Sequence, residues 1–401
     1  MKMIHLSDLH IGKSIDRFRL LEDQKYILRQ ILGIIKTEQP DAVLISGDVY
    51  DRGVPPTEAV DMLDEFLVAL SSLERRGGGK VQTFVISGNH DSPERLAFCS
   101  RLMTDKGIHI CPVYSGVVKP FVMNDQFGEV YIYMLPFVKP DVVRGAVSAI
   151  TGSFDEAEKI KTYTQAVAKA IELMDVDESK RNVILSHQFV GNAVTCDSET
   201  VRVGGIDVVD PAVYSKFRYT ALGHLHTPQT IRTEGGNLIY YSGTPLKYSF
   251  SERTAKSVAC VVMDEFGNTA VRRIPLSPLR DMREVRGTFA EIMASGEKSE
   301  DFIKVILSDT EIHSNYYNDL RSLFPNIISF TAENARSKKS GGIGSDITPD
   351  KSELEIFGDF FSIMNGREMT SAESDYMQKL IEKIKQKQND SEERGVFSAA
   401  N

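Results

Sequence analysis

The chain has 401 residues and a net charge of −9, and its 41% hydrophobic and 26% charged residues are ordinary for a soluble globular protein of two or three domains. It holds no run of 18 apolar residues and starts without the apolar core of a signal peptide, so neither a membrane-spanning helix nor a cleaved leader is expected. The four cysteines are scattered without a CxxC pair, which predicts free thiols and a cytoplasmic protein and excludes a disulfide framework.

Five short apolar runs alternate with helical patterns along the first part of the chain. They are rich in Val, Ile and Leu and bounded by Gly, Ser or Asp, which is typical of buried strands. Apolar residues at helical spacing predict helices at 23–37, 57–73 and 156–174. This alternation predicts an α/β fold with a layered β-sandwich core, whose second sheet is completed by strands at 237–241 and 257–263. The five runs are Met3–Leu6, Ala42–Ile45, Thr83–Ile86, Val183–Leu185 and Tyr219–Leu222.

Each apolar run is followed at its carboxyl end by residues that can bind a metal ion. Asp8-Leu9-His10 and His224-Leu225-His226 carry ligands at i and i+2, which project to the same side of an extended chain. Because open α/β sheets gather their sites beyond the carboxyl ends of the strands, all these side chains are expected to converge. The series holds five of the eight histidines. Its other motifs are Gly47-Asp48-Val49-Tyr50-Asp51-Arg52, Gly88-Asn89-His90-Asp91 and Ser186-His187.

The donor types indicate the metal and the chemistry. Carboxylate, amide and imidazole groups without sulfur suit Mn, Fe or Zn better than Ca or Mg. Two ions about 3.5–4 Å apart would stabilise the attacking and leaving oxygens of an in-line displacement, with Asp48 as the natural bridging carboxylate. The series therefore predicts a two-metal phosphoesterase, and His5, His109 and His313, which lie outside it, are expected to be structural or surface residues. Glycines at positions 12, 47, 53, 88 and 223 flank the motifs, where tight or left-handed turns are expected.

The remainder of the chain is predicted to form a smaller domain and a tail. Pro275 and Pro278 mark the end of the α/β unit, and strand-like 302–307 and 327–331 enclose a helical pattern at 312–323. The predicted division is an α/β domain at 1–278, a small α+β domain at 279–334, a flexible Ser- and Gly-rich linker at 335–350, amphipathic helices at 351–387 and a disordered tail at 388–401.

The predicted C-terminal helices carry apolar stripes. Short helices after a linker cannot easily bury such stripes alone. Binding in the groove of a partner is one hypothesis, and packing back on their own domain is the other. The stripes are Leu354, Phe357, Phe361 and Met364, followed by Met377, Leu380, Ile381 and Ile384.

The ordered motifs resemble those of the calcineurin-like metallophosphoesterase superfamily. Within it, longer stretches are similar to the SbcD family, the nuclease subunits of bacterial SbcCD complexes. The similarity is specific from residue 1 to about 275 and continues more weakly to the end. The stretches are MIHLSDLHIGK at 3–13, GDVYDRGVPP at 47–56, SHQFV at 186–190, VGGID at 203–207, YTALGHLHTPQ at 219–229 and YSGTPLKYSFSE at 241–252.

The resemblance implies a role for each motif residue. His90 would contact the scissile phosphate and assist the leaving group, Asp91 would orient His90, and Arg52 would position Asp48 or bind phosphate. The complete ligand set argues against a non-catalytic member. One metal would be held by Asp8, His10, Asp48 and His226, and the other by Asp48, Asn89, His187 and His224.

The resemblance also implies an activity and partners. It implies a Mn²⁺-dependent 3′→5′ exonuclease on duplex ends and endonuclease at single strands and hairpins, which acts in DNA repair, recombination and replication. A hydroxide activated by two metals would attack the phosphodiester, and the 279–334 domain would cap the site. The chain has no Walker A pattern, so a coiled-coil ATPase of the SbcC type, bound through the C-terminal helices, would hydrolyse ATP. A homodimer within a heterotetramer is implied.

Three matters stay open at this level. Strong DNA binding requires cationic groups, so either a local basic groove exists on this acidic chain or the partner supplies much of the grip. Basic stretches at 75–80 and 272–286 are candidates, but an ordinary solvated surface explains them equally well. The same site could serve a small-molecule phosphodiesterase or a protein phosphatase. A further alternative to the nuclease is a non-catalytic scaffold for a partner ATPase.

Overall fold

The computed structural model describes residues 1–191, 193–197, 199, 208–233, 237–309, 312–313 and 315–332, together with 354, 357–358, 361, 367 and 369–381. The predicted linker at 335–350, the tail at 388–401 and the VGGID stretch at 203–207 lie outside these residues.

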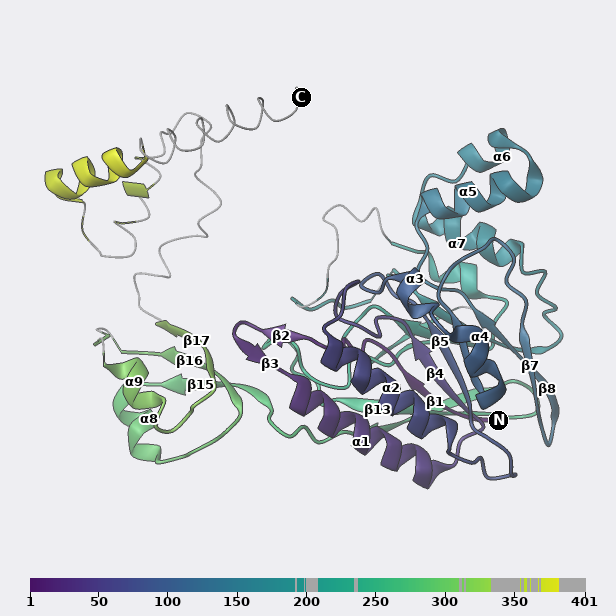
Figure 1. The fold of residues 1–401 in the computed structure, drawn as a ribbon, viewed down its shortest axis with the longest axis horizontal. Helices are drawn as coiled ribbons and strands as arrows, with labels where there is room; N and C mark the ends of the chain where they lie inside the picture. Colours follow the sequence, from purple (N-terminus) through teal and green to yellow (C-terminus); the bar gives the residue numbers. More distant parts are fainter. Residues whose placement is uncertain are drawn as a thin grey trace. The chain divides into compact units, whose positions relative to one another are not determined.

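The first of two six-stranded sheets runs in the order β14–β13–β1–β4–β5–β6. Figure 1 labels its strands β13, β1, β4 and β5. Its four strands from β1 to β6 are parallel, whereas β13 and β14 are antiparallel additions at one edge. Three of the apolar runs identified in the sequence form β1, β4 and β5. The strands are β1 Lys2–Leu6, β4 Ala42–Ser46, β5 Gln82–Ile86, β6 Ile108–Cys111, β13 Ser257–Met263 and β14 Thr269–Pro275.

The second six-stranded sheet has the order β11–β12–β10–β9–β8–β7. It again has four parallel strands, β8, β9, β10 and β12, with antiparallel β7 and β11 at its edges. The prediction that 237–241 completes this sheet is confirmed, but 257–263 pairs with β1 in the first sheet. The strands are β7 Phe121–Asp125, β8 Gly128–Met134, β9 Arg181–His187, β10 Tyr219–Gly223, β11 Gln229–Arg232 and β12 Leu238–Tyr241.

The predicted layered sandwich is confirmed by three hydrophobic clusters. Met3 and Leu44 of the first sheet pack between the sheets with Leu185 and Tyr219 of the second. The opposite face of the first sheet packs on α1 (Leu21–Glu38) and α2 (Thr57–Ser71). The outer face of the second sheet packs on α5 (Pro140–Thr151) and α7 (Tyr163–Glu172). Both faces of each central strand are therefore buried, which explains why these strands read as continuous apolar runs.

The helical patterns are mostly confirmed, with one correction. The single helix predicted at 156–174 is two helices, α6 (Phe154–Glu158) and α7. The helices are separate because Thr162 is the N-cap of α7. Its hydroxyl accepts from the backbone N–H of Gln165, whose side chain in turn accepts from the N–H of Thr162. The shorter elements of this part are β2 Ser14–Ile15, β3 Phe18–Arg19, α3 Pro93–Leu96, α4 Ser100–Met103 and the 3-10 turns Thr104–Lys106 and Pro211–Tyr214.

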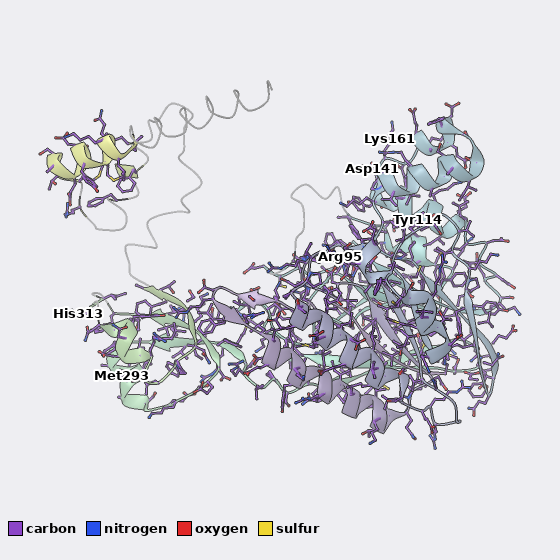
Figure 2. The ribbon with its side chains drawn as sticks, in the orientation of Figure 1. Arg95, Tyr114, Asp141, Lys161, Met293 and His313 are labelled. Carbon is purple, nitrogen blue, oxygen red and sulfur yellow. The ribbon has the colours of Figure 1, made fainter. Side chains whose placement is uncertain are left out.

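The C-terminal region contains a three-stranded sheet in the order β15–β16–β17. The helix expected at 312–323 is shorter and spans Tyr316–Leu320. It ends early because the hydroxyl of Ser322 donates to the carbonyl of Asp319 and Pro325 follows soon after. Figure 2 draws the side chains, with Met293 labelled on α8 and His313 before α9. The elements are β15 Met282–Gly287, α8 Phe289–Ser295, β16 Phe302–Leu307, α9 Tyr316–Leu320 and β17 Ile327–Ala332, and residues 371–381 form a further helix.

The described residues form two compact units. One comprises those within 1–285, 296–305 and 317–330, and the other comprises those within 286–295, 306–316 and 331–401. Among the described residues, none of the helices has both the length and the apolar character needed to cross a bilayer.

Candidate metal centre

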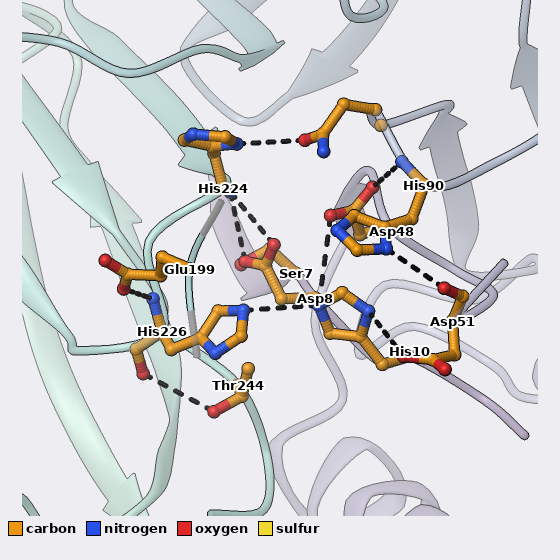
Figure 3. Close-up of polar contacts among 12 residues, drawn as sticks. Ser7, Asp8, His10, Asp48, Asp51, His90, Glu199, His224, His226 and Thr244 are labelled. Carbon is orange, nitrogen blue, oxygen red and sulfur yellow. Dashed lines mark hydrogen bonds and ion pairs between the residues drawn. The ribbon is translucent and has the colours of Figure 1, made fainter. Parts of the chain in front are cut away.

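The predicted ligands come from both sheets and meet at the carboxyl ends of their parallel strands (Figure 3). Asp8 and His10 follow β1, Asp48 follows β4, and Asn89 follows β5. His187 ends β9 of the second sheet, and His224 and His226 follow β10. The expected convergence therefore holds for all seven residues, although they span more than two hundred positions of sequence.

One cluster of donor atoms is formed by Asp8, His10 and His226, whose ligand atoms lie within 4.8 Å of one another. The Nε2 atoms of His10 and His226 are 3.2 Å apart. Figure 3 marks this contact with a dashed line. The Nε2 of His10 also lies 3.8 Å from Oδ2 of Asp48. Imidazole nitrogens that face each other beside carboxylates suit a cation between them, so the residues fit a bound metal.

A second cluster adjoins the first. The Nε2 of His187 lies 3.3 Å from Oδ2 of Asp48. The side-chain oxygen of Asn89 lies 3.0 Å from that nitrogen and 2.9 Å from Nδ1 of His224. These donors are nitrogen and oxygen atoms, the set expected for Mn, Fe or Zn. Oδ2 of Asp48 lies near ligands of both clusters, which fits a bridging carboxylate.

The backbone at four of the predicted ligands is left-handed. Asp8, His10, Asp48 and His224 have φ angles of 52°, 45°, 48° and 101°. Non-glycine residues adopt this region at a cost, and they persist there when surrounding contacts fix them. Here the N–H of Asp8 donates to the carbonyl of Gly47 at 3.0 Å, and that of His10 donates to the carbonyl of Asp48 at 3.0 Å. The two ligand loops thus hold each other in shape.

The flanking glycines matter more for close approach than for turns. A Cβ at Gly88 would lie 2.1 Å from Oδ1 of Asp48, and one at Gly223 would lie 2.0 Å from the carbonyl oxygen of Ser46. Neither has a left-handed φ, so the turn predicted from the sequence is not the reason for glycine at these positions. Gly47 combines both reasons, with φ at 86° and a Cβ position 2.4 Å from Nδ1 of His187.

Replacing Gly88 with alanine is expected to displace Asp48 and weaken Mn²⁺ binding at both positions. Because the added methyl group would overlap the carboxylate predicted to bridge the two metals, we expect at least the roughly 10–100-fold loss typical of changes around metal ligands. Mn²⁺ titration followed by electron paramagnetic resonance measures it. Gly53→Ala is the matched control, since its Cβ would meet nothing closer than 3.7 Å. Normal Mn²⁺ binding by Gly88→Ala would contradict the assigned crowding.

His90 lies beside the clusters and has its own supports. Its backbone N–H donates to Oδ1 of Asp48 at 2.8 Å, and its Nδ1 lies 2.9 Å from the carbonyl oxygen of Asp51. Its ring lies perpendicular to that of His10, with centroids 4.9 Å apart. His90 is only half-buried, so it can reach a substrate at the edge of the metal centre.

The side chain of Asp91 does not contact the ring of His90, and that of Arg52 does not contact Asp48 among the contacts of the described residues. The Asp91 carboxylate accepts from the backbone N–H groups of Val49, Tyr50 and Gly88, at 3.1, 2.8 and 2.8 Å. Asp91 therefore ties together the loops after β4 and β5, whereas the Asp51 carbonyl faces the His90 ring. Arg52 is 62% exposed in its side chain, and its guanidinium lies 3.8 Å from Asp51 rather than against Asp48.

Burial and mutual charge shift the pKa values of the clustered side chains. Burial raises the pKa of Asp8 to about 6 and lowers that of His224 to about 3. Burial opposes a charge on His187, but the charge of Asp48 outweighs it and raises the pKa of His187 to about 9. His187 in turn holds the pKa of Asp48 low against the effect of burial. A metal needs ionised carboxylates and neutral imidazoles, so its binding must release protons here.

Further groups that the sequence did not predict surround His226. Its Nδ1 lies 3.4 Å from Oε1 of Glu252, and Lys256, which is ion-paired with Glu252, donates to the His226 carbonyl at 2.9 Å. The backbone N–H of His226 donates to Glu199 at 2.5 Å, and Thr244 donates to Glu252 at 3.2 Å. Such partners fix the ring orientation of a metal ligand. Glu252 ends the stretch at 241–252 that resembles the family. That resemblance was the only feature of the sequence that could have indicated a role for Glu252.

The three other histidines lie outside the clusters. His5 is fully buried, with Nδ1 2.8 Å from the hydroxyl of Tyr219. His109 lies 2.9 Å from the side-chain oxygen of Gln82, and the ring of His313 contacts that of Tyr316.

Comparisons with known proteins place this geometry in a family. The family model of calcineurin-like phosphoesterases matches residues 1–228, more than half of the chain. The SbcD subunit of nuclease SbcCD from Staphylococcus epidermidis is 30% identical over 389 residues, which cover 95% of this chain and 98% of that protein. The chain belongs to the SbcD family of calcineurin-like phosphoesterases.

Other comparisons extend the similarity beyond the phosphoesterase part. The SbcD subunit of nuclease SbcCD from Staphylococcus saprophyticus is 28% identical over 393 residues, which cover 95% of this chain and 98% of that protein. The model described as the type 5 capsule protein repressor C-terminal domain matches residues 278–365. A solved dimetal phosphatase from Danio rerio has a TM-score of 0.41 and 12% identity, over 70% of this chain and 98% of that one. The SbcD relatives are thus matched along nearly their whole length.

Proposed function

We propose that this protein is a metal-dependent DNA nuclease, the SbcD-type subunit of an SbcCD complex that acts in DNA repair, recombination and replication. The observation that carries the proposal is a full set of nitrogen and oxygen donors at the end of a calcineurin-like sandwich, in a chain similar to SbcD proteins over almost all of its length. Hydrolysis of a phosphodiester is the reaction that such a site supports.

The ligand assignment is part of the proposal. One ion would bind Asp8, His10, Asp48 and His226, and the other Asp48, Asn89, His187 and His224. The short distances among these donors support it. The purely nitrogen and oxygen character of these donors supports Mn²⁺, although Fe and Zn have similar preferences.

The protein groups would act as follows. Bound metals would supply electrostatic stabilisation of the attacking and leaving oxygens. His90, held by Asp48 and Asp51, would contact the scissile phosphate and donate a proton from its ring to the leaving oxygen. Arg52, which is exposed at the rim, could reach a phosphate of the DNA backbone. Asp91 would act as a positioning residue for the ligand loops.

The activities, the location and the domain roles complete the proposal. We expect 3′→5′ exonuclease activity on duplex ends, endonuclease activity at single strands and hairpins, and a cytoplasmic location. Arg272 pairs with Glu38 and Arg283 with Glu297 and Asp301, so these cations are already engaged within the chain. That supports a partner which supplies much of the DNA grip. The division into residues 1–278, a capping domain at 279–334, a linker at 335–350, partner-binding helices at 351–387 and a tail at 388–401 is retained as a proposal.

The decisive experiment is cleavage of an end-labelled DNA duplex and a DNA hairpin by the purified protein, alone and with an SbcC-type ATPase. We expect cleavage that requires Mn²⁺, stops with a chelator and gains ATP dependence with the partner. A metal-loaded, folded protein that leaves DNA intact while it hydrolyses a small phosphodiester would contradict the nuclease assignment. Metal loading without turnover of either substrate would favour a scaffold.

The C-terminal helix is the proposed docking element for the coiled-coil ATPase, within a heterotetramer that holds two copies of each protein. Leu380 lies on the helix formed by residues 371–381, and it is 39% exposed. An exposed apolar side chain is expected at a surface that binds a partner. Leu380→Ala should weaken partner affinity by about tenfold, or about 1.4 kcal/mol, in a pull-down titration. Lys379→Ala, its exposed neighbour, is the control. Equal affinity of both variants and wild type would place the partner elsewhere.

A further inference from the structure

Two buried side chains hold the loop that carries His10. The amide nitrogen of Gln24 donates to the carbonyl of His10 at 2.7 Å, and its oxygen accepts from the N–H of Gly12 at 2.9 Å. The hydroxyl of Tyr248 donates to the carbonyl of Leu9 at 2.7 Å, and Gln24 donates to that hydroxyl at 3.2 Å. Gln24 is 1% exposed and Tyr248 is 5% exposed, so water does not compete for these bonds.

Tyr248 also lies against both histidines of one metal cluster. Its ring meets that of His10 edge-on with centroids 5.6 Å apart, and that of His226 at 6.2 Å. Its backbone N–H donates to Glu252, which faces Nδ1 of His226. Gln24 and Tyr248 therefore both support the His10 loop, and Tyr248 also lies against His226.

The chain neighbours of these two residues bind one short segment at the start of β15. Asp23, next to Gln24, is buried and accepts from Nε of Arg280 at 3.0 Å and from a second nitrogen of the same guanidinium. Lys247, next to Tyr248, donates to Asp281 at 2.9 Å and to the carbonyl of Met282 at 3.2 Å. The segment 280–282 is thus bound by two residues, each adjacent to one that holds the His10 loop.

We propose that Arg280 and Asp281 are positioning residues for the metal held by Asp8, His10 and His226, and that they act through Asp23–Gln24 and Lys247–Tyr248. The inference deepens the proposed function, on which it rests. A shift at the start of β15 would move Asp23 and Lys247. Their chain neighbours Gln24 and Tyr248, which bind the His10 loop, would then move with them. The position of this segment would thereby tune metal affinity and, with it, nuclease activity.

The physical character of the links supports transmission. Asp23 and Gln24 share the first turns of α1, so the helix moves both side chains together. The Arg280 guanidinium binds both oxygens of Asp23 and lies over the ring of Phe302, 5.0 Å from its centroid, which restricts its position. A bidentate pair with a buried carboxylate has few alternative arrangements, so a displacement is transmitted rather than absorbed.

Mn²⁺ binding to the full-length protein, followed by electron paramagnetic resonance, tests the inference without relying on cleavage. Gln24→Ala should weaken one of the two Mn²⁺ sites by about 10–100-fold, as loss of a partner of a metal ligand typically does. Arg280→Gln should weaken the same site by about fivefold or more, in the range of ordinary couplings between sites. The double variant should lose less than the product of the two losses, because both act on one loop.

The matched control is Arg181→Gln. Arg181 also binds both oxygens of a buried carboxylate, that of Asp125, at 3.0 and 2.7 Å, but among the contacts of the described residues it touches neither Asp23, Lys247 nor the segment 280–282. It should lower thermal stability yet leave Mn²⁺ affinity unchanged. Lys247→Gln tests the second link if Arg280→Gln fails to fold, since Asp281 is half-exposed and tolerates an unpaired charge better.

The outcomes separate this inference from the proposed function. Wild-type Mn²⁺ affinity in folded Arg280→Gln or Lys247→Gln overturns the inference alone, as does an equal loss in Arg181→Gln. A wild-type protein that binds two Mn²⁺ but leaves DNA intact overturns the nuclease proposal and leaves the coupling testable. A wild-type protein that binds no Mn²⁺ overturns both.

Discussion

Asp48→Asn is expected to remove Mn²⁺ from both proposed positions and to reduce DNA cleavage by about 10³-fold or more, at or above the upper end of what loss of one electrostatic group costs. Oδ2 of Asp48 lies beside His10 and His187, one from each cluster, and Oδ1 accepts from the N–H of His90. One substitution therefore weakens both metal positions and the support of the proposed acid. Mn²⁺ stoichiometry and single-turnover cleavage measure the two effects separately.

The backbone provides a matched control for this variant. Asp48 has a left-handed φ of 48°, which asparagine tolerates as well as aspartate, so the exchange should not disturb the fold. Asp16→Asn is the control, because Asp16 has a φ of 51° and lies exposed between β2 and β3. Two Mn²⁺ ions and wild-type cleavage in Asp48→Asn would show that Asp48 is not the shared ligand.

His90→Gln is expected to lower the rate of the chemical step by about 10²–10⁴-fold while both Mn²⁺ ions stay bound, because that is the range of general acid catalysis. Glutamine keeps the backbone N–H that binds Asp48 but cannot donate a proton from an imidazole. Single-turnover kinetics with saturating Mn²⁺ measure the rate. His313→Gln, a change at an exposed histidine outside the centre, is the control.

The same experiment distinguishes two roles for His90. Its side chain lies near His10 and Asp51 in an arrangement that could itself hold a cation. If His90→Gln loses one Mn²⁺ as well as activity, His90 is a ligand and the proposed acid must be sought elsewhere. Retained metal with lost cleavage supports its contact with the phosphate.

The strands and the donor residues were predictable because their signals are local. Each run such as Ala42–Ile45 is apolar throughout, since helices cover one face of its sheet and the other sheet covers the opposite face. The ligands follow these runs directly, so the rule that sites gather beyond strand ends was sufficient to bring together His10 and His226.

The contacts around the donors were not predictable, because they join residues far apart in the sequence. Nothing near Gln24 signals a bond to His10, and Glu252 looks like an ordinary surface acid until it is found buried beside His226. The contacts of Asp91 differ from the expected contact with His90 for a related reason. Its position next to His90 suggested a side-chain contact, whereas its carboxylate turns to backbone N–H groups of another loop.

The distribution of ligands over two sheets has a consequence for the biogenesis of the nuclease. Asp8, Asp48 and Asn89 are made early, whereas His187, His224 and His226 emerge from the ribosome more than ninety residues later and belong to the other layer. A nascent chain that stops between these groups holds half a centre and has no catalyst. Because the predicted ligands lie on both sheets, we expect the metal centre to form only after the two halves of the sandwich have packed together.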